Sequence, residues 1–204
     1  MKILAVCTGS AEILPGKSYR TGIFKHPVDA GVMIDREGLV GDRICNRKHH
    51  GGPDQAVYAL GSADLDWWSK ELGRVLQPGL FGDNLVIDGA DSRTISVGDR
   101  FATEAVELEV TSARIPCATL ASRMGDPGFA RRFARAGRPG FYCRVLKDGV
   151  VKAGDAVTYH AYTGLPVLMP EMLETFGRNL SGEDRSRYLA APIHHKLRAK
   201  LTSM

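Results

Sequence analysis

Cys117 is the residue whose neighbours most clearly suggest chemistry, because an arginine and a proline stand directly before it in the stretch RIPC. The preceding run at residues 106–110 alternates apolar and acidic residues, which predicts a half-buried strand. Pro116 lacks a backbone N–H and has a fixed φ, so we expect it to end strand pairing and leave the cysteine on a rigid turn. The Arg114 guanidinium favours a thiolate, which is both a nucleophile and a ligand for soft metals. For any single cysteine, the alternative is a small buried packing residue.

A glycine loop, HGGPDQAV, begins at His50 and supplies a second group of candidate residues. Gly51 and Gly52 permit backbone conformations that other residues avoid, so an extended ligand can lie against bare backbone amides. The imidazole of His50 can be neutral or protonated near neutral pH. Lys48 adds a cation beside the loop. An ordinary turn is the alternative for a lone His-Gly-Gly, and the other motifs of the chain argue against it here.

Two further turns carry polar side chains suited to ligand binding. Arg43, in the turn GDR, offers a forked cation that suits phosphate, whereas Asp42 before it serves equally well to cap its own turn. In FGDNL, Asp83 and Asn84 can read the N–H and C=O groups of a ligand. A single thiolate is too few protein ligands for zinc, which normally takes three or four. A metal that is brought in with sulfur ligands of its own would remove that objection.

The first 160 residues must position these groups, and their pattern is typical of short strands separated by turns. We expect about ten strands, including one at 94–97 and a hairpin formed by residues 141–146 and 149–152. Helices are predicted at 62–72 and shortly after Asp126, where an N-cap precedes a proline. The prediction is a mainly β fold in which a closed or nearly closed β-barrel has short helical insertions.

The character of the chain changes after residue 160. Residues 168–176, 183–190 and 193–201 read as short helices with too little apolar content to fold alone. We therefore predict a barrel domain over 1–160 and a C-terminal helical segment over 161–204, packed on the barrel or on a second copy in a homodimer. His194 and His195 are adjacent, so their rings should diverge around a helix, which disfavours a shared metal.

Composition narrows the class of protein. The 204 residues are 44% hydrophobic and 25% charged with a net charge of +4, as in a globular protein, and no apolar run reaches the roughly 18 residues of a membrane span. The four cysteines form no C-x-x-C pair and no export signal precedes them, so reduced thiols in the cytoplasm and no membrane partner are expected. Strands that interleave aromatic and basic residues are absent, so no nucleic-acid partner is expected.

The four motifs in this order resemble the MOSC family, named for the C-terminal domain of molybdenum cofactor sulfurases, and above all its single-domain bacterial members. The resemblance covers roughly residues 1–160 and rests on HGGPDQAV together with the later RIPC. It implies a β-barrel that holds a molybdopterin-type cofactor, with Cys117 coordinating molybdenum. Many relatives carry glutamate where Asp83 stands, which puts in doubt any contact that needs the longer side chain.

The resemblance to the hydroxylaminopurine reductase members implies a molybdenum-cofactor oxidoreductase that reduces N-hydroxylated compounds. In this hypothesis Cys117 binds the metal and His50 or Asp54 donates a proton. The expected cofactor-binding residues are Arg43, Lys48, Gly51, Gly52, Asn84 and Arg114. No G-x-G-x-x-G follows a strand, so the electrons would come from a separate reductase or iron–sulfur protein. The alternative is a non-catalytic cofactor-binding or sulfur-carrier module with a persulfide on Cys117.

Overall fold

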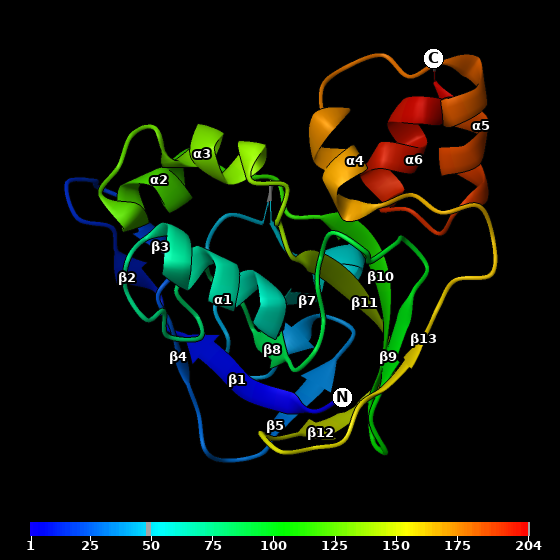
Figure 1. Ribbon diagram of the computed structural model, residues 1–204. Coiled ribbons are helices and arrows are strands. Elements are labelled where there is room, and N and C mark those ends of the chain that lie inside the picture. Colours follow the sequence, from blue (N-terminus) through cyan, green and yellow to red (C-terminus); the bar gives the residue numbers. More distant parts are fainter. Residues whose placement is uncertain (48–49, 204) are drawn as a thin grey trace.

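The computed structural model describes residues 1–47 and 50–203, and its largest element is an eight-stranded sheet (Figure 1). Neighbouring strands are antiparallel except β7 and β8, which are parallel. In sheet order the strands are β13 (Thr158–His160), β9 (Arg100–Ala102), β10 (Glu107–Ala113), β11 (Phe141–Lys147), β7 (Val57–Gly61), β8 (Leu85–Ile87), β1 (Ile3–Gly9) and β4 (Lys25–Pro27).

The order of the sheet is linear, and among the described residues no pairing joins its edge strands β13 and β4. Closure of a barrel is therefore not confirmed, and with six α-helices among the described residues the fold is mixed and sheet-rich rather than mainly β. The strand predicted at 94–97 is wrong: these residues form turns, with a single bridge from Ser96 to Leu168.

Two smaller sheets complete the β structure. One contains β12 (Gly149–Val151), β5 (Val32–Asp35) and β6 (Gly38–Leu39), so the predicted hairpin between β11 and β12 is wrong because β12 pairs with β5 instead. The other is a two-stranded hairpin of β2 (Glu12–Ile13) and β3 (Arg20–Thr21).

Three helices cover one side of the sheet around a cluster of aromatic rings (Figure 1). They are α1 (Ser62–Glu71), α2 (Ala118–Met124) and α3 (Phe129–Arg135). The fully buried Trp68 of α1 stacks on Phe133 of α3 with ring centroids 5.4 Å apart, and it meets Phe81 edge-on. The structure confirms the helix predicted at 62–72 to within one residue. The packing of Trp68 shows why the apolar face of this helix is buried.

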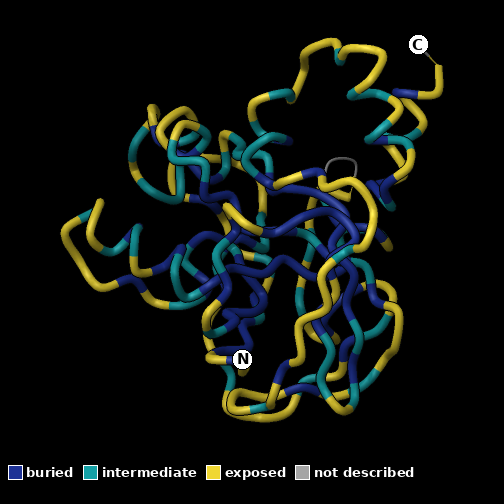
Figure 2. The backbone as a smooth tube through the Cα atoms, turned by 45° about the vertical axis from the view of Figure 1, so that its right-hand side comes forward, coloured by how far each residue is buried: buried dark blue, intermediate teal, exposed yellow. Residues whose placement is uncertain are grey.

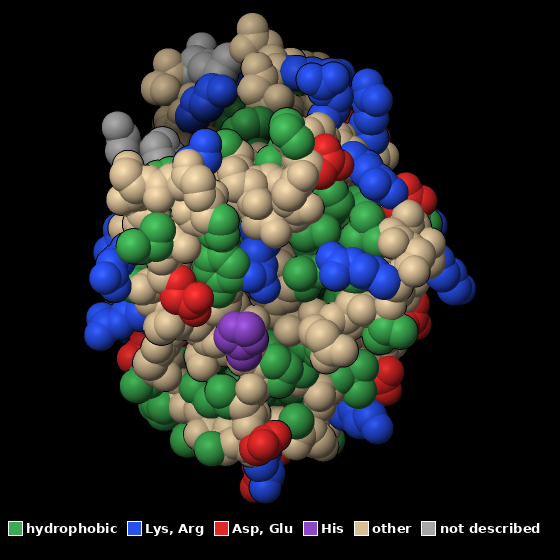
Figure 3. Space-filling view, turned by 90° about the vertical axis from the view of Figure 1, so that its left-hand side faces the viewer, with side chains coloured by type: hydrophobic (Ala, Val, Ile, Leu, Met, Phe, Trp, Pro, Cys, Tyr) green, Lys and Arg blue, Asp and Glu red, His purple; other side chains and the backbone are tan. Residues whose placement is uncertain are grey.

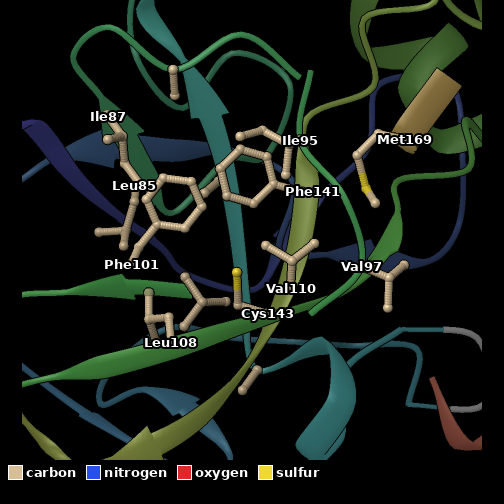
Figure 4. Packing of buried hydrophobic residues seen from close by; sticks show 14 of the residues in the cluster. Leu85, Ile87, Ile95, Val97, Phe101, Leu108, Val110, Phe141, Cys143 and Met169 are labelled. Carbon is tan, nitrogen blue, oxygen red and sulfur yellow. The ribbon is translucent and has the colours of Figure 1, made fainter. Parts of the chain in front are cut away.

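The C-terminal helices α4 (Met169–Glu174), α5 (Gly182–Ala190) and α6 (His195–Thr202) lie together at one end of the molecule (Figure 1). Val167 and Met169 belong to the same hydrophobic core as Val97 and Val110, as Figure 4 shows for Met169. Figure 2 shows that the main sheet is largely buried while the outer sides of these helices are exposed. The segment thus packs on the sheet, and a domain boundary at residue 160 stays a prediction. Among the described helices, none has the length and apolar character needed to cross a membrane.

Candidate functional site

A cavity of about 280 Å³ opens where the motifs identified in the sequence converge. Its walls are the β2–β3 hairpin, the turn after β6, the glycine loop, the inner strands and the start of α2. Of the residues predicted for the site, the cavity is lined by Arg43, His50, Gly51, Asn84, Arg114 and Cys117. Segments more than 70 residues apart in the sequence therefore meet in one place.

Cys117 directly precedes α2 and lines the cavity with its half-buried thiol. β10 ends at Ala113, before Pro116, as predicted, and Pro116 lies in the irregular segment between β10 and α2. Burial by itself would raise the pKa of the Cys117 thiol. A hydrogen bond to the His50 side chain, the backbone N–H of Leu120 and the charge of Arg114 outweigh that effect and lower the pKa to about 6, from an ordinary value of 9.0. Cys117 is therefore a thiolate at neutral pH.

Arg114 places a buried cation in the wall of the cavity. Its side chain is only 5% exposed, and its guanidinium lies over the rings of Tyr58 and Phe133 at 5.3 and 5.4 Å from their centroids. Its Nη1 is buried and has no hydrogen-bond partner among the described residues. The Oε1 of Gln55, another residue of the cavity wall, is also buried and unpaired among those residues. A buried unpaired donor and acceptor are costly, and a ligand that carries both an anion and an N–H group would satisfy this pair.

The glycine loop adopts the backbone conformation that the sequence predicts. Gly51 and Gly52 have φ angles of +76° and +87°, and a Cβ on Gly51 would lie 2.8 Å from the Ile44 Cδ1. The loop therefore needs glycine, and it carries His50 to the thiol of Cys117. Gly52 lies beside the cavity wall at the start of the 3₁₀ turn Pro53–Gln55 and does not line the cavity itself. The predicted contact at Lys48 lies outside the described residues.

Asn84 lines the cavity, but its amide is already used to hold the strands together. Its Oδ1 accepts a hydrogen bond from the Tyr58 backbone N–H at 3.2 Å, and its Nδ2 donates to the Cys7 carbonyl and the Asp42 carboxylate at 3.2 and 3.0 Å. Asp42 in turn pairs with Lys25. Asn84 therefore shapes the floor of the cavity rather than offering a free amide.

Asp83 and Arg43 were both candidates for ligand binding, and the structure supports this role for Arg43 but not for Asp83. Asp83 is fully buried, and its carboxylate accepts the backbone N–H groups of Gly79 and Phe81 at 2.7 and 3.2 Å, so it stabilises its own turn and reads no ligand. Arg43 is exposed and lines the mouth of the cavity, where its guanidinium is available to an anion. Its backbone passes so close to Gly22 that a Cβ there would lie 1.6 Å from the Arg43 oxygen.

Asp54 is not brought to the cavity, which argues against its predicted role as proton donor. Its carboxylate accepts a hydrogen bond from Arg144 Nε at 2.9 Å and from the backbone N–H of His195 at 2.7 Å. Burial would raise the pKa of Asp54, but the hydrogen bonds from His195 and the charge of Arg144 hold it below its ordinary value. Asp54 therefore fastens the glycine loop to the C-terminal segment.

His194 and His195 stack with ring centroids 4.5 Å apart, so the expectation that their rings diverge is wrong. The cause is that His194 precedes α6 with φ −51° and ψ 133° instead of lying within the helix. Together with Asp54 the pair resembles a metal site. However, the His194 Nδ1 lone pair accepts the Lys196 backbone N–H at 3.0 Å, so in the neutral ring Nε2 carries the proton. The arrangement caps a helix and favours no metal; burial lowers the pKa of His194 to about 4.

Several residues of the cavity wall were not predicted, and one of them could have been. Phe141 and Cys143 of β11 are buried in the main core, so Tyr142 between them must point to the opposite face, where it lines the cavity. That alternation is visible in the sequence. The others include Tyr19, Arg20, Thr21, Lys25, Gln55, Tyr58 and Thr119, and their position at the cavity depends on long-range packing.

Comparison with known proteins identifies the family. Residues 46–158 match the MOSC domain, and an uncharacterized protein of Bacillus subtilis, YflK, is 34% identical over 154 residues, 74% of this chain and 70% of that protein. The chain belongs to the MOSC family. A protein of Gibberella moniliformis named Reductase is 31% identical over 70% of this MOSC chain and only 26% of its own length. The crystal structure of YiiM from Geobacillus stearothermophilus has a TM-score of 0.80, with 21% identity, and the match covers 99% of this chain and 97% of that one.

The cavity of this MOSC protein fits the cofactor associated with the family. A molybdopterin-type group brings an anionic phosphate, pterin N–H groups and a soft metal that already has sulfur ligands. The wall offers the unpaired Arg114 Nη1 for an anion, the unpaired Gln55 Oε1 for an N–H group and the Cys117 thiolate for a soft metal. The fit rests on these three side chains and not on the size of the cavity alone.

Proposed function

We propose that this protein is a molybdenum-cofactor oxidoreductase that reduces N-hydroxylated compounds, with hydroxylamino purines as the substrate class. The observation that carries the proposal is the thiolate of Cys117 in a cavity whose wall also contains an unpaired buried cation and an unpaired buried acceptor. Membership of the MOSC family and a relative named Reductase support the redox character of the reaction.

The chain's own residues would divide the work of holding the cofactor. Arg114 binds an anionic group in the interior of the site, and Arg43 binds one at the mouth. Gln55 accepts an N–H, and the backbone at Gly51 allows close approach of an extended ligand. Cys117 supplies the thiolate that completes the metal's ligand set. When bound, the cofactor supplies two-electron removal of an oxygen atom.

Reduction of the substrate also consumes protons. Conversion of R–NHOH into R–NH₂ and water takes up two electrons and two protons, so the site needs a group that delivers protons near the thiolate. His50 lines the cavity and hydrogen-bonds Cys117, whereas Asp54 is held by Arg144 and His195 outside it. We assign the proton delivery to His50 on this difference in position.

The proposal is tested with protein purified from cells with intact cofactor synthesis and reduced chemically by methyl viologen radical. We expect conversion of a hydroxylamino purine to the amine, with none in protein from tungstate-grown cells. Failure of molybdenum-loaded protein to reduce any N-hydroxylated compound would contradict the proposal.

The rival function is a sulfur carrier, which the low pKa of Cys117 also suits, because a thiolate attacks the outer sulfur of a donor protein's persulfide, takes that sulfur as its own persulfide and releases the donor's thiolate. Mass spectrometry of freshly purified protein separates the two functions. A persulfide on Cys117 in protein without molybdenum favours the carrier, and an unmodified thiol with bound molybdenum favours the reductase.

A further inference from the structure

We propose that the β2–β3 hairpin and the adjoining turn at Arg43 form the docking surface for a separate electron-donor protein with an acidic surface around a flavin or an iron–sulfur cluster. The inference rests on the proposed function. It says what kind of protein delivers the two electrons that each reduction consumes and where on this chain that protein binds.

The hairpin exposes side chains that the core does not use. Ile13 is 61% exposed and Tyr19 44% exposed, although Leu14 between them in the hairpin is completely buried and anchors it. The hairpin lies beside α2 on one side of the molecule (Figure 1), and a hydrogen bond of 3.4 Å joins Tyr19 to Thr119. Exposed aromatic and aliphatic side chains close to arginine are typical of the centre of a protein interface.

The hairpin also stands at the mouth of the candidate active site. Tyr19, Arg20 and Thr21 line the cavity that contains Cys117. Electron tunnelling weakens steeply with distance, so a donor must place its redox centre close to that mouth. A protein seated on the hairpin meets this requirement.

The charge at this mouth selects the partner. Lys17 and Arg20 are exposed and have no carboxylate partner within ion-pair distance among the described residues, and the Arg20 Nη1 donates to the Ala11 carbonyl. Arg43 beside them is assigned to an anionic group of the cofactor, so it is not counted with these two cations. The opposing acid on the hairpin is Glu12, which accepts a hydrogen bond from Ser10.

Asp42 does not offset these cations, because it is paired with Lys25. The mouth is therefore net positive, and Lys and Arg side chains lie among hydrophobic ones over this side of the molecule (Figure 3). A positive patch attracts an acidic protein and raises the association rate. Electron-transfer interfaces are small, so this attraction, which depends on salt, contributes much of the association.

The probes are an acidic [2Fe–2S] ferredoxin, reduced with dithionite, and methyl viologen radical as a small reductant. The variants are Lys17→Glu and Ile13→Glu, because neither residue lines the cavity. The matched control is Arg178→Glu, at an exposed arginine of the C-terminal segment that makes no ion pair with the residues that the structure describes. Electron transfer is followed by stopped flow at 50 and 300 mM NaCl, and binding of ferredoxin to cofactor-free protein is measured in parallel.

We expect both hairpin variants to slow ferredoxin-driven reduction about tenfold at low salt and to weaken ferredoxin binding, with the Lys17→Glu difference shrinking at high salt. Reduction by methyl viologen and the behaviour of Arg178→Glu should be unchanged. Equal ferredoxin rates and equal ferredoxin binding in all variants would overturn the proposal. It would also be overturned if the hairpin variants slowed reduction by methyl viologen as much as reduction by ferredoxin, because the hairpin would then control access to the cavity as a lid. Binding of oligonucleotides in place of ferredoxin would also overturn it. If methyl viologen drives no turnover at all, the proposed function fails, and the binding measurement still decides the docking surface.

Discussion

The depressed pKa of Cys117 makes a quantitative prediction about its reactivity. In cofactor-free protein, alkylation of Cys117 by iodoacetamide should follow a titration with a midpoint near 6 instead of 9. At pH 7 about 90% of a thiol with pKa 6 is thiolate, against about 1% of a thiol with pKa 9. The weaker nucleophilicity of the low-pKa thiolate offsets about 20-fold of that gain, so the rate at pH 7 rises only about fourfold. The midpoint of the pH profile, and not the rate, is therefore the diagnostic quantity.

The assay uses Cys45→Ser protein, because Cys45 is exposed and would react as well, whereas Cys7 and Cys143 are buried. Alkylation is measured by peptide mass spectrometry between pH 4.5 and 9.5. His50→Ala removes the hydrogen bond that lowers the pKa most and should move the midpoint upward, because burial, which raises the pKa, is then opposed only by the Leu120 N–H and the charge of Arg114. A midpoint near 9 in the parent protein, or no shift in His50→Ala, would refute this account of the thiolate.

Three further predictions concern two residues of the cavity wall and Asp54, which fastens the glycine loop. Arg114→Met should abolish cofactor retention. The melting temperature of the cofactor-free protein should stay unchanged or rise, because the substitution removes a buried cation that has an unpaired N–H. A fall in both cofactor retention and melting temperature would indicate a structural role for Arg114. Asn84→Ala should lower the free energy of unfolding by about 3 kcal/mol in urea, since three hydrogen bonds of about 1 kcal/mol each are lost. Asp54→Asn should destabilise the protein at pH 7, with the difference from the parent disappearing as pH falls through the lowered pKa of Asp54, because a carboxyl group with a depressed pKa stabilises only while ionised; a constant difference down to low pH would contradict the ion-pair explanation.

The local chemistry of the site could be predicted from residue types. Pro116 and Arg114 indicated a strand end and a thiolate at Cys117, and two adjacent glycines indicated a loop with positive φ. The strand end and the positive φ angles follow from residues close in the chain. The thiolate does not follow from Arg114 alone, because the hydrogen bond with the distant His50 lowers the pKa of Cys117 most.

Interactions between distant residues could not be predicted in this way. The contact of Asp54 with His195 joins residues 141 positions apart in the sequence. It holds the Asp54 carboxylate away from the cavity, although its place in the loop motif had suggested a contact with the ligand. The pairing of β12 with β5 instead of β11 depends likewise on tertiary packing, which local turn chemistry does not specify. Stacking of His194 on His195 follows from a helix that begins at His195, two residues later than the predicted start at residue 193.

If Cys117 holds molybdenum in this cavity, its replacement must change the metal content of the protein, which two cysteine variants can show. Both Cys117 and Cys45 line the cavity, so Cys45→Ser is the matched control for Cys117→Ser. Proteins from cells with intact cofactor synthesis are compared by mass spectrometry of their molybdenum content and by turnover with methyl viologen. We predict that the parent and Cys45→Ser retain molybdenum and that Cys117→Ser loses the metal or its redox activity. A Cys117→Ser protein that is fully loaded and fully active would contradict the account.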